Sequence, residues 1–153
     1  MKQLSILILF VIACFQSNPK VWRINNTPGV VADFTNCATA LASSSVVNDD
    51  TLYIEGSATS YAGFTLDKRL VIIGTGYFIS GSDSNPGLQL GNSSSFGSGY
   101  IIFDSTGSGS TLIGLDNFTF GVGQTGSAAD NITITRCRMN SISAYYGNVA
   151  NTI

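Results

Sequence analysis

A glycine-rich segment near the C-terminus has the spacing of a dinucleotide-binding loop. Gly121-Val122-Gly123-Gln124-Thr125-Gly126 follows an apolar run and satisfies the G-x-G-x-x-G pattern. That chemistry needs a helix directly after the loop, because the N-terminus of the helix holds the pyrophosphate. Here Ser127-Ala128-Ala129-Asp130 leads straight into the apolar run that begins at Ile132. The motif therefore indicates a loop between strands, and we expect no cofactor.

Composition excludes several other chemistries. The chain has no histidine, which removes His-based general acid-base catalysis, the Ser-His-Asp and Cys-His arrangements, and nearly all zinc hydrolase sites. Seven basic and nine acidic residues give a formal net charge of −2 and form no basic run, so nucleic acid is not an expected partner. Charged residues make up 10% of the chain and hydrophobic residues 44%, a composition unlike that of disordered chains and coiled coils.

The first residues have the pattern of a targeting segment. Lys2 precedes an apolar run from Leu4 to Ala13, interrupted only by Ser5, which predicts a secretory signal over residues 1–13. The run is shorter than the roughly 20 residues that span a bilayer, so we expect no transmembrane span in the mature chain. Val11-Ile12-Ala13-Cys14 resembles the lipobox of bacterial lipoproteins, in which the cysteine becomes a lipid anchor.

Ordinary signal cleavage near the same point is the alternative to lipidation of Cys14. Residues 14–20 would then be a tail or linker. Both interpretations predict a protein that is secreted or displayed on the outer cell surface. The two remaining cysteines, Cys37 and Cys137, are predicted to be small buried hydrophobes and not a disulfide.

Residues 21–50 are expected to hold one strand and one helix. Val21-Trp22-Arg23-Ile24-Asn25 alternates apolar and polar residues, which is typical of a strand. Asp33 can act as an N-cap, and an apolar stripe with helical spacing follows it up to Ala42. The stripe consists of Phe34, Cys37, Ala38, Leu41 and Ala42.

From residue 51 onward the chain consists of short apolar runs, each closed by Gly, Asn or Ser. The spacing from Leu112 to Ile132 indicates a repeat of about 20 residues, and that from Ile72 to Leu112 is close to twice as long, in the range of solenoid proteins. Asn117 and Asn131 suit tight corners, because Asn tolerates the left-handed backbone conformation.

The segment from Asp130 to Met139 predicts which side chains face inward. It alternates and then shifts phase near Arg136, as a bend between two faces of one coil would require. The residues expected to face inward are Ile132, Ile134, Cys137 and Met139. Those expected to face outward are Thr133, Thr135, Arg136 and Arg138.

Several segments together resemble a known family. The helix from Asp33 to Ala42, then Asp50-Thr51-Leu52-Tyr53-Ile54-Glu55-Gly56 and Tyr61, are similar to the N-terminal cap and first coil of secreted bacterial right-handed parallel β-helix proteins with the pectate-lyase-like fold. Thr111-Leu112-Ile113-Gly114-Leu115-Asp116-Asn117-Phe118 and Asn131-Ile132-Thr133-Ile134 resemble its repeating coils. The resemblance extends over about residues 21–153.

The resemblance implies an all-β fold, a right-handed parallel β-helix with an N-terminal capping α-helix. Residues 21–50 would hold the first strand and the cap, and residues 51–153 the coils. Because solenoids need both ends covered and the sequence reaches Ile153 without a capping element, we expect the chain to be the N-terminal portion of a longer protein or the product of a truncated reading frame.

The lyases of this fold use aspartates as calcium ligands and a lysine or arginine as base. Candidates in this chain are Asp104, Asp116, Asp130, Lys68, Arg69, Arg136 and Arg138. Each aspartate stands singly beside Gly, Ser or Asn, where Asp commonly caps a turn, whereas calcium takes six to eight oxygen ligands. No segment matches a catalytic motif of the family, so we assign no catalytic or metal residue and expect Arg136 and Arg138 to be solvated charges.

The leading hypothesis is an extracellular module with a scaffold, adhesion or glycan-binding role. Tyr145 and Tyr146 are the preferred residues for sugar stacking, with Tyr61 and Tyr77 as further candidates. The alternative is the N-terminal part of a polysaccharide lyase or glycoside hydrolase, and only this alternative would require calcium.

Overall fold

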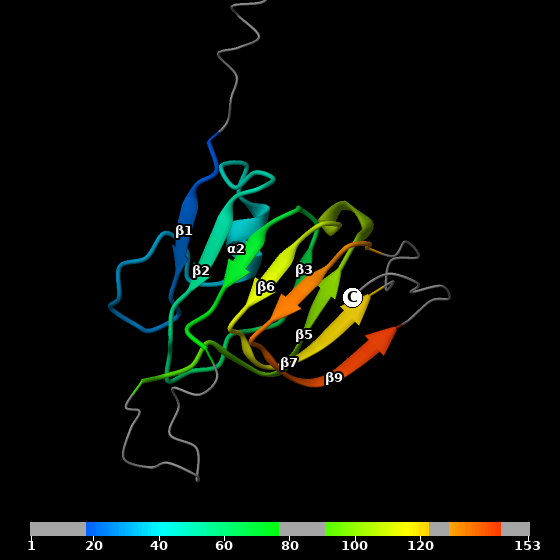
Figure 1. Cartoon of the computed structure of the whole chain (residues 1–153). Helices are drawn as coiled ribbons and strands as arrows, with labels where there is room; N and C mark the ends of the chain where they lie inside the picture. The colour runs from blue at the N-terminus through cyan, green and yellow to red at the C-terminus, as the bar shows by residue number, and fades with distance from the viewer. Residues whose placement is uncertain (1–17, 77–90, 123–128, 145–153) are drawn as a thin grey trace, which may run out of the picture.

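The computed structural model describes residues 18–76, 91–122 and 129–144 as short strands with very little helix (Figure 1). The single α-helix among them is α2 (Cys37–Ala42), and a 3-10 turn, η1 (Ser105–Gly107), follows β5. The strands are β1 (Val21–Ile24), β2 (Thr51–Ile54), β3 (Phe64–Leu66), β4 (Val71–Ile73), β5 (Ser95–Phe103), β6 (Thr111–Ile113), β7 (Asp116–Val122), β8 (Thr133–Thr135) and β9 (Arg138–Ala144). The all-β class is therefore confirmed.

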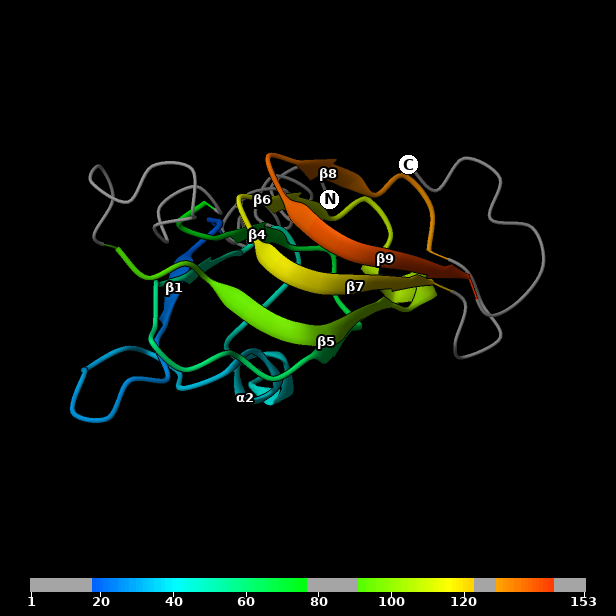
Figure 2. The ribbon, with the colours of Figure 1, turned by 90° about the horizontal axis from the view of Figure 1, so that it is seen from below.

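Every pair of neighbouring strands in the described residues is parallel. Five strands form one sheet in the order β1-β2-β4-β6-β8, and four form a second in the order β3-β5-β7-β9. From β2 onward, successive strands alternate between the two sheets, which Figure 2 shows as two layers. Parallel sheets bury apolar residues that stack from strand to strand.

The core consists of such stacked rows. One row runs across the five-stranded sheet through Trp22, Leu52, Ile72, Leu112 and Ile134. In the other sheet, Phe64, Ile101 and Phe120 form an equivalent buried row. Because side chains alternate along a strand, the neighbours of these residues point outward.

The segment from Asp130 to Met139 follows the predicted alternation. Ile132 is buried, and Ile134, Cys137 and Met139 are partly buried against the core. The four residues predicted to face outward are exposed, namely Thr133, Thr135, Arg136 and Arg138. Asn117 and Asn131 have positive φ values of 55° and 56°, so both adopt the predicted left-handed conformation. Asn131 precedes β8 as a corner residue, whereas Asn117 lies within β7, at a shift in its register with β9.

The predicted start of the helix was wrong. Asn36 is the N-cap and accepts a hydrogen bond from Thr39 N. The Asp33 carboxylate instead accepts a hydrogen bond from Arg23 N, at 2.8 Å. Phe34 forms a β-bridge with Ile24 of β1. Asp33 and Phe34 are therefore bound to the edge of the sheet, and the helix is limited to Cys37–Ala42.

Residues 34–42 lie at one end of both sheets. Phe34 bridges β1, the first strand of the five-stranded sheet, and α2 packs against β3, the first strand of the other. Cys37, Ala40 and Leu41 bury their side chains there. Both Cys37 and Cys137 are free thiols, as predicted.

The predicted repeat needed two corrections. Leu112 pairs with Ile134 and not with Ile132. Ile72 pairs directly with Leu112, so the interval between them is one long step and not two repeats. One of the short apolar runs that follow residue 51, at residues 88–90, lies outside the described residues.

Candidate functional site

The outer face of the five-stranded sheet presents two rows of side chains, which we call the outer β1–β8 face. The first row consists of Val21, Thr51, Val71, Thr111 and Thr133. The second consists of Arg23, Tyr53, Ile73, Ile113 and Thr135. β-Branched residues dominate because they pack well on a pleated surface.

One ion pair lies at the β1 edge of this face. The guanidinium Nε of Arg23 is 2.5 Å from Glu55 Oε1. Its hydrogen bond raises the pKa of Arg23, and the hydrogen bonds from Arg23 and Asn25 lower the pKa of Glu55. Arg23 is the only charged residue in the two rows, so the rest of the outer β1–β8 face is neutral.

Tyr53 is the aromatic residue of this face. Its relative exposure is 36%, and Arg23 and Ile73 flank it on the neighbouring strands. An exposed tyrosine ring bordered by aliphatic side chains and threonine hydroxyls can stack against a flat, partly apolar ring and hydrogen-bond to its polar rim. Side chains alternate between the two faces of a strand. Because Tyr53 stands between the apolar residues Leu52 and Ile54, the sequence alone could have predicted that Tyr53 points outward.

The tyrosines named from the sequence do not form this site. Tyr61 is only 2% exposed, and its hydroxyl donates to Glu55 O at 2.8 Å and to Ile24 O at 3.3 Å. Burial raises its pKa to about 12. The prediction that Tyr61 contacts glycan was therefore wrong, because its ring belongs to the core. Tyr77, Tyr145, Tyr146 and the predicted anchor Cys14 lie outside the described residues.

Arg138 is not a free solvated charge, contrary to expectation. Its Nε donates to Asp116 Oδ1 at 2.6 Å, and its Nη2 donates to Oδ2 at 2.9 Å. Asp116 is 2% exposed and also accepts a hydrogen bond from Ser93 Oγ at 2.9 Å. The Asp116 carboxylate is therefore bound by Arg138 and Ser93 inside the protein, as in a structural ion pair.

The other charged candidates are dispersed. Asp104 caps η1 by accepting a hydrogen bond from Ser105 N, and Arg69 forms a bidentate pair with Asp49. Arg136 and Asp130 are exposed at corners. Within the described segments, no three carboxylate or thiol side chains gather around one point. This donor set does not fit calcium, which needs several converging oxygens.

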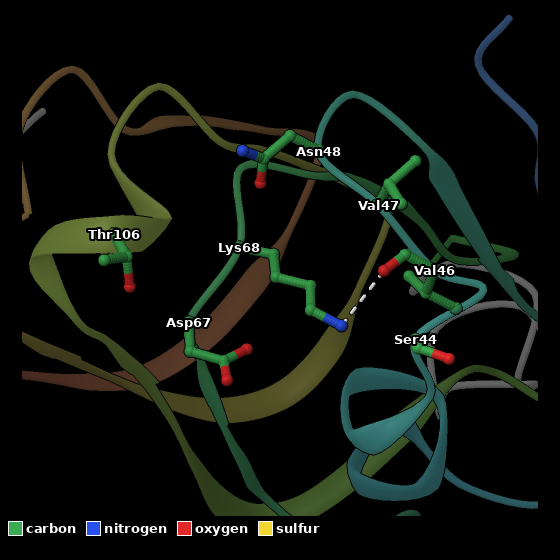
Figure 3. Close-up of a pocket in the computed structure, with 7 residues that line it drawn as sticks. All are labelled: Ser44, Val46, Val47, Asn48, Asp67, Lys68 and Thr106. Carbon is green, nitrogen blue, oxygen red and sulfur yellow. Dashed lines mark hydrogen bonds between the residues drawn. The ribbon is translucent and has the colours of Figure 1, made fainter. Parts of the chain in front are cut away.

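A cleft of about 500 Å³ lies beside the end of α2. It is lined by Ser44, Val46, Val47, Asn48, Asp67, Lys68 and Thr106. Figure 3 shows the Lys68 side chain reaching across it toward Val46. The ammonium donates to Leu41 O at 2.6 Å and to Ser43 O and Val46 O at 3.0 Å each. Lys68 therefore satisfies carbonyl groups that the end of the short helix leaves open, and its three donors are occupied.

The structure describes only the first two residues of the glycine-rich motif. Gly121 and Val122 end strand β7, whereas residues 123–128 lie outside the described residues. Within the part of the chain that the structure describes, no helix is both long and apolar enough to cross a membrane.

Comparison of the chain with protein-family models, with curated proteins and with solved structures finds no match in any of the three.

Proposed function

We propose that this chain is an extracellular or cell-surface module, built as a right-handed parallel β-helix, that binds glycans through the outer β1–β8 face. Three features support the helical path: parallel pairing throughout the described strands, alternation of successive strands between two sheets, and left-handed corners. Parallel connections of this kind are right-handed in nearly all proteins.

The neutral surface around Tyr53 is the observation on which the binding role rests. Its two rows carry one ion pair at the β1 edge, while threonine hydroxyls and aliphatic side chains occupy the rest. Strands lie about 4.8 Å apart, so the rows form a flat track at right angles to the strands. An extended sugar chain could lie along this track with its apolar ring faces on Tyr53, Ile73 and Ile113.

Binding to insoluble and arrayed neutral polysaccharides tests this role. Tyr53→Ala removes the stacking surface and should weaken retention roughly three- to tenfold. Thr111→Arg places a bulky charge in the middle of the face and should weaken it at least as much. Thr65→Ala, an exposed position on the other sheet, is the matched control. Absence of retention, or equal retention by all variants, would contradict the proposal.

The extracellular location rests on the predicted signal in residues 1–13. Mass spectrometry of the protein expressed in a bacterial host, with separation of membrane and soluble fractions, tests it. Removal of residues 1–13 supports secretion, and a lipid-modified Cys14 supports anchoring. An intact Met1 on protein retained in the cytoplasm would contradict export.

A further inference from the structure

Four solvent-exposed polar side chains line the cleft beside α2, and a ligand could take the place of the water that hydrates them. The Asp67 carboxylate and the hydroxyls of Ser44 and Thr106 have no hydrogen-bond partner within the described part of the chain. Asn48 uses its Oδ1 to accept a hydrogen bond from Arg69 N at 3.1 Å. Its Nδ2 is left with two donors that no described residue accepts. The cleft therefore offers both donors and acceptors.

The orientation of the Asn48 amide is fixed by its contact with the backbone. Because Arg69 N must face an oxygen, the amide cannot flip without losing this bond. Nδ2 is then held as a donor, while Asp67 can only accept hydrogen bonds in its ionised form. A ligand with neighbouring hydroxyl groups, each both donor and acceptor, matches this combination.

Lys68 offers a ligand in the cleft its aliphatic chain and not its charge. Its ammonium is held by three carbonyl oxygens at the end of α2, so a ligand would meet its methylene chain and not a free cation. Val47, which is exposed, adds aliphatic surface to the lining, whereas the Val46 side chain is buried in the core beneath it. Figure 3 shows Val46 and Ser44 on one side of the Lys68 side chain and Thr106 on the other.

We propose that this cleft binds a single neutral sugar ring, with Asp67 accepting hydrogen bonds from a pair of hydroxyls, Asn48 Nδ2 donating to the ring, and Val47 packing on its apolar face. A concave site with a few directed polar groups and an aliphatic wall is the general form of small-ligand sites. The cleft lies among the loop after α2, the β3–β4 corner and η1, and is separate from the outer β1–β8 face. This inference goes beyond polymer binding and does not depend on it.

The test is a titration of the full chain with monosaccharides, followed by NMR of labelled protein and by calorimetry. The probes are glucose, galactose, mannose and N-acetylglucosamine at millimolar concentrations, with glucosamine and galacturonate as charged comparisons. We expect shifts at residues 44–48, 67–68 and 106. Asp67→Asn should weaken binding about tenfold, because it removes a charge-assisted acceptor, and Asn48→Ala should weaken it severalfold.

Asp130→Asn, which neutralises an exposed carboxylate outside the cleft, is the control and should bind like the unmodified chain. Tyr53→Ala should also bind monosaccharides normally, which separates failure of this site from failure of the outer face. The proposal is overturned if no sugar shifts the cleft residues, if Asp67→Asn binds as well as the unmodified chain, or if only glucosamine binds and salt abolishes its binding, since that result would indicate a cation site.

Discussion

The indole of Trp22 donates a hydrogen bond of 2.8 Å to the carboxylate of Asp50, a residue 28 positions later in the chain. Asp50 also accepts hydrogen bonds from Lys20 N at 2.7 Å and from Val47 N at 3.0 Å. Its side chain is buried. One carboxylate thus joins the first strand, the loop after α2 and the start of β2, and replaces the water that these three donors would otherwise bind.

Asp50→Asn should destabilise the fold. An amide supplies one oxygen where the carboxylate supplies two, and its NH₂ group would face a backbone or indole N–H. Hydrogen bonds to a charged group contribute about 1.5–3 kcal/mol each, so we expect a loss of about 2–3 kcal/mol in the free energy of unfolding. Urea titration followed by tryptophan fluorescence measures it. The exposed substitution Asp130→Asn should leave the midpoint unchanged.

Acid should weaken the protein through the same carboxylates. Burial works to raise the pKa of Asp50, but the bonds from Trp22, Lys20 and Val47 outweigh it and hold that pKa below its usual value. The hydrogen bond from Arg23 lowers the pKa of Glu55 in the same way. Arg69 also lowers the pKa of Asp49, but both side chains are about half exposed, so solvent screens this pair and its share is small. A lowered folded pKa stabilises the protein above the unfolded value of about 4.

This stabilisation is lost as the pH falls through the folded pKa values. The urea midpoint should therefore be level near neutral pH and fall progressively below about pH 4.5. Asp50→Asn should show a shallower fall, because one of the linked groups is gone. A midpoint that rises on acidification would refute the assignment of these carboxylates as ionised and paired.

Removal of Arg138 should cost far more than removal of Arg69. Arg138→Met leaves the buried Asp116 carboxylate with the Ser93 hydroxyl and no counter-charge, and unpaired buried charges are strongly destabilising. Because half of the Arg138 side chain is exposed and water can enter, we expect about 2 kcal/mol. Arg69 pairs with Asp49 where both side chains are about half exposed, so Arg69→Met should leave the urea midpoint almost unchanged.

The inward rows could be predicted from the sequence because alternation is local. Ile132, Ile134 and Met139 were placed correctly from neighbouring residues alone. The pairing of Arg138 with Asp116 joins residues 22 positions apart and depends on register, which no short window contains. The helix start was missed for the same reason, because the partner of Asp33 is a backbone N–H of β1.

From the sequence, the type of candidate site could be predicted but not its location. A neutral polar surface with an exposed aromatic followed from composition, and alternation in β2 would have identified Tyr53. Tyr61 was a further candidate from the sequence, yet its hydroxyl donates to two backbone carbonyls that come together only in the fold. The cleft beside α2 joins three loops distant in sequence, so no local pattern indicates it.

The two described cysteines should differ in reactivity. Burial raises the pKa of the Cys37 thiol, and burial also raises that of Cys137, though hydrogen bonds from Leu115 and its neighbours oppose it. Since the thiolate is the nucleophile, both should react slowly in the native state, with half-buried Cys137 modified first. Timed alkylation at pH 8 and peptide mass spectrometry measure the order. Equal rates under native conditions would contradict the burial of Cys37.

Arg136→Gly should stabilise the protein. The pairing of Ile113 with Thr135 places Arg136 at the position equivalent to Gly114 on the preceding strand, and their φ values are 53° and 67°. A non-glycine residue in this conformation costs about 1–2 kcal/mol, while glycine adds about 0.5–1 kcal/mol of unfolded-chain entropy. We expect a net gain of about 0.5–1 kcal/mol.

The reverse change at the equivalent corner is the control. A Cβ at Gly114 would lie 3.1 Å from Gly74 O and 3.2 Å from Gly76 N, so Gly114→Ala adds crowding to a strained φ and should destabilise the fold. Thermal unfolding of both variants measures the difference. If Arg136→Gly lowers the midpoint, the Arg136 side chain makes a stabilising contact that outweighs its backbone strain, and the prediction is wrong.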